Sequence, residues 1–590
     1  MLRKTRKTIA SFLALSMVLS MASTGLTANA ETTKTIADLA DSTAKVSFSD
    51  ISSHWASKEI NNWSQKGIIN GYEDGTFKPN TPILRSEFAS LVNRVFAYPS
   101  KTTQSFPDVS SSAWYAQDIS KAVAAGIVVG DDKGNFKPEA PISRQEAAVI
   151  LSRAFDLKAQ DTKASDRFTD AGTIASWSKD SVNALLEGGY VSGREDGSFD
   201  PLANITRAEF VKMIDSVVGE LKYAANTYTG NVNSNLVINT KDVNLKNMTI
   251  SGDLYITSGV GEGNVSLDNV TVKGRTVVRG GGEHSIVINN SNLVGTLLVV
   301  KSDGKIRILM QGSSDIPHVQ LNSGAKLEAE NATGKGFGDV QIIGMVSADQ
   351  EIKLDGNFAN ISVEAPGVAV QVIDGSVNKI DVKEKAVGSS VKVLEGNVNQ
   401  LNVQTKVAID LSGGIVANVD IQKSAAGTSV QMASNSSVTN FKIDAPIEVK
   451  GSGKIETASI NVDGVKIETK PTKITVADGV KSDVTTTTPT GGSSRRSSSN
   501  PTLSKTAAEV ADTITTIAAP AKDVATLTLP SVPAGFTVAI MTSSDTGVIA
   551  LDGTIALPKE ATTVNLVLEV TRTSDNSKAS TASIAVVVPA

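Results

Sequence analysis

Between residues 228 and 482, short apolar runs alternate with polar residues, with Gly and Asn between them. One spacing, apolar-x-x-apolar-x-apolar, begins at Phe358, Val377, Val398, Val416, Val438 and Ile455. Successive copies start 19, 21, 18, 22 and 17 residues apart. A period near twenty with short strands predicts a β-solenoid, whose stacked coils bury a column of Val and Ile. The alternative is one or two β-sandwiches, in which turns recur about every 8–12 residues.

Before this region, a unit of two predicted helices occurs three times, in residues 46–98, 104–157 and 166–222. The units start with Phe-x-Asp at Phe48, Phe106 and Phe168, which lie 58 and 62 residues apart. A Trp follows each start, and an apolar helical segment then leads to a Gly-bounded turn and a second turn with Gly and Pro. Gly adopts backbone angles that other residues resist, and Pro blocks continuation of a helix.

The second helix of each unit has a recognisable start. Thr206-Arg207-Ala208-Glu209 and Ser143-Arg144-Gln145-Glu146 both fit a capping box, with a hydroxyl at the N-cap and Glu three residues later. The first unit has Leu84 at the N-cap position, so we expect its helix start to be weaker by about 0.5–2 kcal/mol.

The first thirty residues have the organisation of a secretory signal peptide. Four basic residues between positions 3 and 7 precede an uncharged apolar stretch from Ile9 to Met21, and Ala28-Asn29-Ala30 has the small-x-small pattern of a cleavage site. The apolar stretch is shorter than the roughly 20 residues that span a bilayer. We therefore expect residues 1–30 to be removed on export, and no membrane insertion afterwards.

Composition excludes several kinds of chemistry. The 590 residues include 61 acidic and 56 basic ones, three His and no Cys. Without Cys there is no disulfide, thiolate zinc site or Cys nucleophile. The mild net charge of −5 argues against nucleic-acid binding. Because the three His lie far apart in the sequence, neither a His-dependent metal site nor a cofactor is expected.

The C-terminal part differs again. Residues 484–500 are rich in Gly, Ser and Thr and predict a flexible linker. Residues 501–590 contain strand-like runs such as 536–541 and 564–571, which suggest a small β-sandwich. The segments 533–538 and 568–572 resemble an atrophied bacterial Ig-like domain.

The three N-terminal units resemble S-layer homology (SLH) domains of Gram-positive cell surfaces. The resemblance rests on the Phe-x-Asp start, the Trp, the two Gly turns and the Thr-Arg-Ala-Glu helix start, in the same order in each unit. It implies α-helical, pseudo-trimeric repeats with a groove between each neighbouring pair. Members of the family bind secondary cell-wall polysaccharide attached to peptidoglycan, often through a pyruvylated sugar that carries a carboxylate.

The resemblance also implies which residues meet in each groove. The first groove would combine Ser192, Arg207, Trp63 and Gly71. The second would combine Asn70, Arg85 and Gly130, with Ala122 where an aromatic ring would stand. The third would combine Val129, Arg144 and Gly193, with Leu185 at the aromatic place. Because a sugar face stacks well on Trp and poorly on Ala, we expect the groove of Arg207 and Trp63 to bind most strongly.

The residues themselves support a ligand at these arginines. Arg85, Arg144 and Arg207 each fall in the first turn of a predicted helix, where the helix dipole disfavours a cation. Beside unpaired backbone N–H groups, such an Arg would form a pocket for an external carboxylate. The alternative is that each Arg pairs with a nearby Asp or Glu. The Trp that follows each start, with Asp50 and Asp108, is interpreted as structural.

These patterns together predict a secreted, wall-anchored and non-enzymatic surface protein: three SLH repeats, a β-solenoid, a linker and an exposed Ig-like domain. Several alternatives stay open. The solenoid also resembles right-handed β-helices of polysaccharide lyases, and Asp253, Asp268 and Arg275 or Arg279 could then form a catalytic site. The protein could instead self-associate as a subunit of a surface lattice, or act as an adhesin through residues 501–590.

Overall fold

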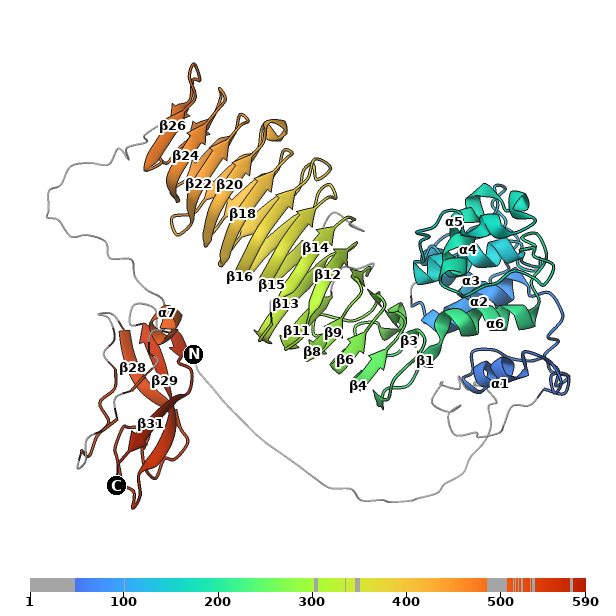
Figure 1. The fold of residues 1–590 in the computed structure, drawn as a ribbon, viewed down its shortest axis with the longest axis horizontal. Coiled ribbons are helices and arrows are strands. Elements are labelled where there is room, and N and C mark those ends of the chain that lie inside the picture. Colours follow the sequence, from blue (N-terminus) through green and yellow to red (C-terminus); the bar gives the residue numbers. More distant parts are fainter. Residues whose placement is uncertain are drawn as a thin grey trace, which may run out of the picture. The chain divides into compact units, whose positions relative to one another are not determined.

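The computed structural model describes residues 48–99, 101–301, 306–334, 336–344 and 351–484, and most of residues 507–589. In this last stretch the positions left out are 513, 515, 518, 521–523, 531, 533–535 and 573–576. The expected signal peptide and all but the first residue of the expected linker lie outside the described residues. The chain divides into two compact units, Met1–Thr488 and Pro489–Ala590 (Figure 1).

Each SLH repeat contributes two helices, as the sequence predicts. They are α1 (Ser57–Gln65) and α2 (Arg85–Phe96), α3 (Ala116–Ala124) and α4 (Arg144–Phe155), and α5 (Ser176–Glu187) and α6 (Arg207–Val218). Two short 3₁₀ helices, η2 (Ala164–Arg167) and η3 (Ala171–Thr173), precede α5. At α4 and α6 the hydroxyls of Ser143 and Thr206 accept hydrogen bonds from the N–H groups of Glu146 and Glu209, which confirms both capping boxes.

The three repeats close into a ring through their main chains. The N–H of Ile83 donates to the carbonyl of Ile205, that of Ile205 to Ile142, and that of Ile142 to Ile83, at 3.0–3.2 Å. All three isoleucines are buried. Beside this ring the rings of Phe88 and Phe210 lie 4.5 Å apart, so α2 and α6 share one core. The closed ring is the pseudo-trimeric arrangement that the SLH resemblance implies.

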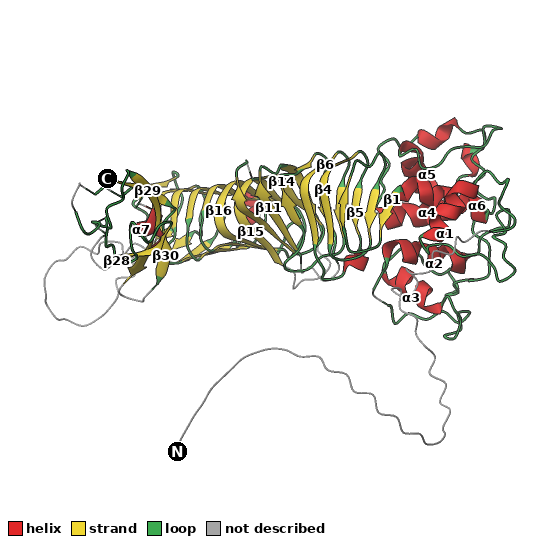
Figure 2. Ribbon diagram, turned by 90° about the horizontal axis from the view of Figure 1, so that it is seen from below, coloured by secondary structure: helices red, strands yellow, loops and turns green. Residues whose placement is uncertain are grey.

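The described strands between residues 220 and 484 form one 27-stranded parallel sheet wound into a solenoid (Figures 1 and 2). Its first strands are β1 (Glu220–Lys222), β2 (Thr227–Thr229), β3 (Leu236–Ile238), β4 (Val243–Ile250), β5 (Leu254–Ile256), β6 (Val265–Val272), β7 (Thr276–Val278), β8 (Val287–Asn289), β9 (Asn292–Leu293), β10 (Leu297–Val299), β11 (Arg307–Gly312), β12 (Ile316–Leu321), β13 (Ala325–Ala332) and β14 (Phe337–Ile342). The 3₁₀ helix η4 (Ser258–Val260) follows β5.

The later strands are β15 (Glu351–Val363), β16 (Ala369–Val382), β17 (Ser390–Val393), β18 (Asn397–Val403), β19 (Ala408–Leu411), β20 (Ile415–Ile421), β21 (Ser429–Met432), β22 (Ser437–Ile443), β23 (Glu448–Gly451), β24 (Lys454–Ile460), β25 (Lys466–Ile467), β26 (Lys473–Val476) and β27 (Asp483–Val484). The 3₁₀ helix η5 (Lys423–Ala425) lies between β20 and β21.

The repeated apolar spacing lines the inside of the solenoid. In β18 the buried residues are Val398, Leu401 and Val403. They stand in register with Val416, Val419 and Ile421 of β20. Identical positions of neighbouring coils therefore stack into one apolar column, and the solenoid prediction is confirmed. The β-sandwich alternative is wrong for this region, because neighbouring strands pair in parallel.

The second unit contains the short helix α7 (Ala507–Asp512) and an antiparallel sheet of β28 (Phe536–Ser543), β29 (Thr562–Arg572), β30 (Lys578–Ser580) and β31 (Ile584–Val588). Two isolated bridges, Thr526 with Thr554 and Ile549 with Ile555, lie outside this sheet. Within the described residues of this unit, the one extended sheet packs its buried face against α7 and neighbouring loops, around a common apolar core. Across the described parts of the chain, no helix is both long and apolar enough to cross a membrane.

Candidate binding grooves of the SLH bundle

The three arginines that begin α2, α4 and α6 are held in the same way. Arg207 donates from Nε to the carbonyl of Phe77 at 3.0 Å and from Nη2 to the carbonyl of Asn70 at 2.9 Å. Its Nη1 forms an ion pair with Glu87. Since Arg207 belongs to the third repeat and its partners to the first, each such contact joins two repeats.

The other two arginines repeat this pattern. Arg85 donates to the carbonyls of Phe136 and Val129 and pairs with Glu146. The corresponding partners of Arg144 are the carbonyls of Phe199 and Ser192, with Glu209 at 3.6 Å. The Arg–Glu pairing that stood as the alternative to ligand binding is therefore present in all three repeats.

These contacts change the expected grouping of residues. Gly71 lies with Arg207, and Gly130 lies with Arg85, as expected. By contrast, Asn70 lies with Arg207 instead of Arg85. Likewise, Ser192 lies with Arg144 instead of Arg207, and Val129 with Arg85 instead of Arg144. The physical reason is simple: Asn70 and Gly71 are neighbours in one turn, so they face the same groove. Gly193, which follows Ser192, thus stays with Arg144.

The helix starts do not offer free N–H groups, contrary to the expectation. The N–H of Arg207 donates to the carbonyl of Thr81, and the N–H of Ala208 donates to the carbonyl of Pro79. The third N–H, of Glu209, donates to the Thr206 hydroxyl. Because α2 and α4 repeat the first two bonds with the Pro-containing turns of the next repeat, these amides hold the ring together and are not available to an external anion.

Gly71 is required for packing between two motifs. A Cβ atom at this position would lie 2.2 Å from Cε1 of Phe48, the first residue of the Phe-x-Asp start. Asp50 of the same motif accepts hydrogen bonds from the N–H groups of Phe77 and Lys78 at 2.8 Å. Burial alone would raise the pKa of Asp50, but these two hydrogen bonds outweigh it and lower the pKa. The structural interpretation of Asp50 is thus correct, as it is for Asp108, which holds Phe136 and Lys137 in the same way.

The aromatic wall of the first groove is not Trp63. This side chain is 0% exposed, and its Nε1 donates to Asp215 at 2.9 Å. The equivalent positions, Ala122 and Leu185, are also fully buried. All three belong to the core, so the residue at this position says nothing about how well a groove stacks on sugar.

Two other tryptophans line cavities instead. Trp114, 62% exposed, borders a cavity of about 240 Å³ that also contacts Arg207, Arg94, Tyr72 and Gly71. Each of the three repeats contributes to this cavity, which we call the Arg207 groove.

Trp177, 58% exposed, borders an equivalent cavity of about 310 Å³, the Arg85 groove, with Arg85, Arg153, Gly130 and Asp131. Trp114 and Trp177 were interpreted as structural from the sequence, and their large exposure does not fit that interpretation. Trp55, the equivalent residue of the first repeat, is 60% exposed.

Arg94 and Arg153 are the groove residues that the sequence reasoning missed. Each occupies the tenth position of its central helix, and Ser216 stands there in α6. Arg94 donates to the carbonyl of Ile68 at 3.0 Å, and among the described residues no carboxylate forms an ion pair with it. A comparison of the three helices position by position would have revealed this pair of arginines.

The residue after the second glycine of the Gly turn differs between the grooves. It is Tyr72 in the Arg207 groove, and its ring lies 5.0 Å from the guanidinium carbon of Arg207. In the Arg85 groove it is Asp131, whose pKa is lowered to about 2 by hydrogen bonds, first from the N–H of Asn135 and then from Lys137. At the third position Arg194 pairs with Asp200 and Glu209. Among these three equivalent positions, only the second carries a carboxylate. Glu87 and Glu146 also line the two cavities, but each is paired with the arginine of its groove.

Comparison with known proteins agrees with this fold. The model of the S-layer homology domain matches residues 47–89, 105–148 and 167–211. The chain is similar to the surface-layer 125 kDa protein of Lysinibacillus sphaericus (29% identical, over 28% of this chain and 14% of the relative). It is also similar to the S-layer protein of Bacillus thuringiensis subsp. finitimus (31%, over 28% and 21%) and to the amylopullulanase of Thermoanaerobacterium thermosulfurigenes (33%, over 28% and 9%).

The chain thus carries three SLH domains followed by a β-solenoid, and it is a cell-surface protein. The similarity covers about a fifth or less of the length of these relatives. Because one of them is named as an enzyme and two as surface-layer proteins, the shared region does not by itself distinguish these classes.

The residues that could have served a lyase-like site have other contacts. Asp253 and Arg275 form an ion pair at 2.7 Å, where the solenoid meets the SLH bundle. Asp268 pairs with Lys246 at 3.1 Å. Among the described residues, no group of three or more His, Asp or Glu side chains is arranged to hold a metal ion.

Proposed function

We propose that this protein is anchored non-covalently to the cell wall by its SLH bundle, which binds an anionic, pyruvylated secondary cell-wall polysaccharide attached to peptidoglycan. The observation that carries the proposal is the Arg207 groove: a cavity between repeats that is lined by an exposed Trp and by two arginine side chains. We propose no catalytic step for it.

Each groove residue has a different part in binding the ligand. The Trp114 ring offers a face on which the apolar side of a sugar stacks. Arg94 has no carboxylate partner among the described residues, so its guanidinium is the group that meets the ligand's carboxylate in a charge-assisted hydrogen bond. Arg207, only 8% exposed and already paired with Glu87, acts as a positioning residue that holds the Asn70–Gly71 turn.

The three grooves should differ in strength. In the Arg207 groove, Arg94 and Tyr72 leave the local charge favourable to an anion. The Arg85 groove has Arg153 in place of Arg94, but Asp131, paired with Lys137 at 3.0 Å, stands where the first groove has the neutral Tyr72, so an acidic ligand would lie near this carboxylate. At Arg144 the arginine of the tenth helix position is replaced by Ser216, and Arg194 is already paired with two carboxylates. Avidity for a wall that displays many polymer units then comes from combining one strong groove with two weaker ones.

The test is binding of the full mature chain to purified cell-wall sacculi. Native sacculi, sacculi stripped of the secondary polymer and sacculi freed of pyruvate by mild acid are compared. We expect strong binding to the first, and little to the other two. Trp114→Ala and Arg94→Ala should each weaken binding about tenfold, which corresponds to about 1.4 kcal/mol.

Arg167→Ala is the matched control, because Arg167 lies on the SLH bundle over the ring of Phe168 and outside both cavities. It should bind as the unmodified chain does. Equal binding to native and pyruvate-free sacculi would rule out recognition of the acid group. Full binding by both groove variants would rule out the groove.

A second candidate function is that of a subunit in a surface lattice, since two of the similar proteins are named S-layer or surface-layer proteins. The expected observation is that the purified mature chain assembles into regular sheets, visible by electron microscopy. A chain that stays monomeric at high concentration would instead be a scattered wall-bound protein. The adhesin alternative predicts loss of surface adhesion when residues 501–590 are deleted.

A further inference from the structure

One outward-facing position of the solenoid is apolar in the first coils only. In β3 the flanking residues Leu236 and Ile238 belong to the solenoid core, whereas Val237 belongs to the core of the SLH bundle. Tyr255 of β5, Val277 of β7 and Leu298 of β10 likewise belong to the core of the SLH bundle, while apolar neighbours in the same strands belong to the solenoid core. Strands β3, β5, β7 and β10 are therefore buried on both faces, one inside the solenoid and one beneath the SLH helices.

The change along this column coincides with the extent of the SLH bundle. In register, the column reads Leu221, Val237, Tyr255, Val277 and Leu298, and then Gln320, Gln341, Ser362, Asp381, Asn402, Asp420, Lys442, Ser459 and Thr475. The first five are apolar and buried in the SLH core. The later ones are polar, which is what a solvated sheet face requires.

Polar side chains of the same coils reach the C-terminal ends of all three central helices. Asn239 donates to the carbonyls of Arg94 and Val95 at the end of α2, at 3.2 and 3.0 Å. Asn235 donates to the carbonyl of Val217 near the end of α6, at 2.7 Å. The last carbonyls of a helix have no partner within the helix, so the solenoid supplies the partners that these helix ends lack.

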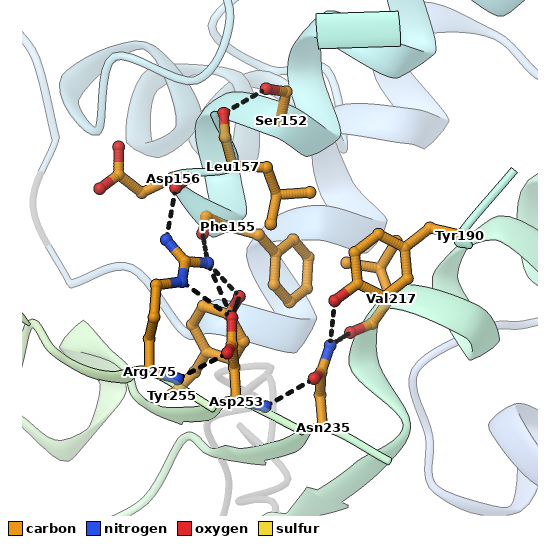
Figure 3. A network of polar contacts seen from close by, with 10 residues as sticks. All are labelled: Ser152, Phe155, Asp156, Leu157, Tyr190, Val217, Asn235, Asp253, Tyr255 and Arg275. Atoms are coloured by element: carbon orange, nitrogen blue, oxygen red, sulfur yellow. Dashed lines mark hydrogen bonds and ion pairs between the residues drawn. The ribbon is translucent and has the colours of Figure 1, made fainter. Parts of the chain in front are cut away.

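At the end of α4 this role falls to Arg275 (Figure 3). Its Nη1 donates to the carbonyl of Asp156 at 2.8 Å, and Nη2 contacts the carbonyl of Phe155 at 3.4 Å. Asp253 holds the guanidinium in place through Nε and Nη2, at 3.0 and 2.7 Å. A cation at a helix C-terminus also meets the negative end of the dipole.

Aromatic packing joins the two regions beneath this network. The ring of Phe155 in α4 stacks edge-on against Tyr255 of β5, with centroids 5.0 Å apart. The Tyr255 hydroxyl donates to Asp253 at 2.8 Å. Burial, followed by the neighbouring Asp253 carboxylate, raises the pKa of Tyr255. Neither ring is accessible to solvent.

We infer that the outward face of β1, β3, β5, β7 and β10 is a docking surface for the SLH bundle of the same chain, so that the bundle and the first coils fold as one unit. The solenoid then leaves the wall anchor in a fixed direction, without a hinge. A fragment that ends at residue 222 would expose the apolar underside of the bundle and leave three helix ends without partners.

The test uses the full mature chain and two probes of thermal unfolding. All four Trp lie in the SLH repeats, so their fluorescence reports on the bundle. Far-UV circular dichroism at the β-sheet wavelength reports mainly on the solenoid. We expect the fluorescence transition to coincide with the main circular-dichroism transition, as in a cooperative unit. Arg275→Ala should lower both midpoints together, by about 2–4 °C.

The matched control is Arg307→Ala, because Arg307 also pairs with a carboxylate, Glu328, on the solenoid but reaches no SLH residue among the contacts described. As a residue of the same cooperative unit that makes no bond to the bundle, it should shift both midpoints together and by less than Arg275→Ala does. Asn239→Ala, which removes only the two bonds to α2, provides a milder variant if Arg275→Ala does not fold. Two well-separated transitions in the unmodified chain, or a fluorescence midpoint that neither junction variant changes, would overturn the inference.

A second, independent observation concerns the far part of the solenoid. A shallow groove of about 680 Å³ crosses the coils of β15, β16, β18 and β20. Its polar lining consists of Asn357, Ser376, Asn378, Asn397 and Asn399. Among the described residues that line it, none carries a charge. Elsewhere on the same coils, charged residues form ion pairs such as Lys379–Asp381 and Lys392–Asp410.

The groove combines apolar and carboxamide surface. Ile415, 49% exposed, stands in register with Asn397 and lines the groove on the next coil. Ser376 donates to Asn357 at 2.7 Å, and Asn399 donates to Asn378 at 3.1 Å, so these side chains are held in order from coil to coil. Each carboxamide keeps further donor and acceptor capacity toward solvent.

We propose that this groove binds a neutral glycan strand lying along the solenoid axis. Hydroxyl and acetamido groups both donate and accept hydrogen bonds, as carboxamides do, and they carry no charge to be compensated. Neighbouring coils are about 4.8 Å apart, so the four coils offer an extended strand a regular series of equivalent contacts.

The test is calorimetric titration of the full mature chain with two neutral oligosaccharides, chitohexaose and maltohexaose, and with acidic polygalacturonate. At least one neutral probe should bind, and Asn399→Ala should weaken it fivefold or more. Asn440→Ala is the matched control, because Asn440 makes the same ladder bond, to Asn418, outside the groove. No binding of either neutral probe, equal effects of both variants, or binding of the acidic polymer alone would overturn the proposal.

Discussion

The SLH bundle and the solenoid are both built from repeats, but they use repetition differently. The bundle closes on itself through Ile83, Ile142 and Ile205, so every repeat touches both others and each cavity lies where repeats meet. The solenoid is open, and a coil contacts chiefly the coils before and after it. Equivalent positions in the bundle have diverged, as Tyr72 and Asp131 show, whereas equivalent core positions in the solenoid remain apolar, as Val419, Phe441 and Ala458 do in one register column.

The comparison teaches that a closed ring couples its sites, while a solenoid keeps the effects of a substitution local. A change at the centre of the bundle should therefore affect all grooves together. A change of equal size in the solenoid core should leave wall binding intact. The following predictions test this difference.

The largest effect is expected for Phe88→Ala. Phe88 is fully buried against Phe210 near the ring of isoleucines, so its loss should cost about 3–5 kcal/mol of unfolding free energy and abolish binding to sacculi. The matched variant is Phe441→Ala, at an equally buried position of the solenoid. Urea unfolding and a sacculus pull-down should show a comparable loss of stability in the solenoid with wall binding retained. Loss of binding in both variants would contradict the comparison.

The next effect is expected for Arg207→Ala. It removes one partner of a nearly buried ion pair and leaves Glu87 and the carbonyls of Asn70 and Phe77 without their donor. Breaking such a pair costs about 3 kcal/mol. Unfolding followed by Trp fluorescence should show this loss. If Arg207→Ala instead lowers wall binding with no change in stability, Arg207 contacts the ligand directly and is not a positioning residue.

Trp114→Ala and Trp177→Ala separate the grooves from each other. Trp114→Ala should weaken binding to sacculi about tenfold, or about 1.4 kcal/mol. The effect of Trp177→Ala should be smaller, because the Asp131 carboxylate in the Arg85 groove is expected to weaken binding of an acidic ligand there already. Both rings are exposed, so neither variant should change the unfolding midpoint appreciably. Equal losses of affinity would show that the grooves are equivalent.

A smaller change in stability is expected for Thr206→Ala. The Thr206 hydroxyl caps α6, and removing it should cost about 1 kcal/mol. The first repeat already has Leu84 at this place and makes no side-chain cap. Chemical denaturation of the full chain measures the loss. A cost near zero would mean that the ring of main-chain hydrogen bonds alone holds the helix starts.

The smallest effect is expected for Asp131→Asn. The amide oxygen can still accept the N–H of Asn135, while the negative charge in the Arg85 groove is removed and Lys137 loses its ion-pair partner. Binding to native sacculi should improve about twofold, which is about 0.4 kcal/mol. The gain should disappear at high salt, where surface charges are screened. A decrease in binding would show that Asp131 contributes to the ligand contacts.

Much of this architecture was predictable. The twenty-residue period identified the solenoid, and ordered motifs identified three SLH repeats with capping boxes at Ser143 and Thr206. The pairing of turns with arginines was not predictable: it depends on the direction in which the ring closes, and the wrong repeat was assigned to Asn70, Ser192 and Val129. Trp63 was misassigned because a buried and an exposed Trp look the same in a sequence.

One signal was present in the sequence and was overlooked. Leu236-Val237-Ile238 and Leu254-Tyr255-Ile256 have three apolar residues in succession, whereas the equivalent positions of later coils read Leu401-Asn402-Val403 and Val419-Asp420-Ile421. A strand with one face in the core and the other in solvent alternates apolar and polar residues, whereas a strand buried on both faces does not. The uninterrupted triplets therefore indicated that something covers the first coils from outside.

The sequence by itself determined what is periodic and local: the solenoid coil, the helical repeat, the helix caps and the absence of thiol chemistry. These follow from side-chain spacing and backbone preference within about twenty to sixty residues. The tertiary structure alone decided which repeats meet at each arginine, which tryptophans reach solvent and which face of the solenoid the SLH bundle covers. Those features depend on contacts between different repeats, or between the bundle and the solenoid, such as Arg85 with Phe136, Arg207 with Asn70 and Arg275 with Asp156.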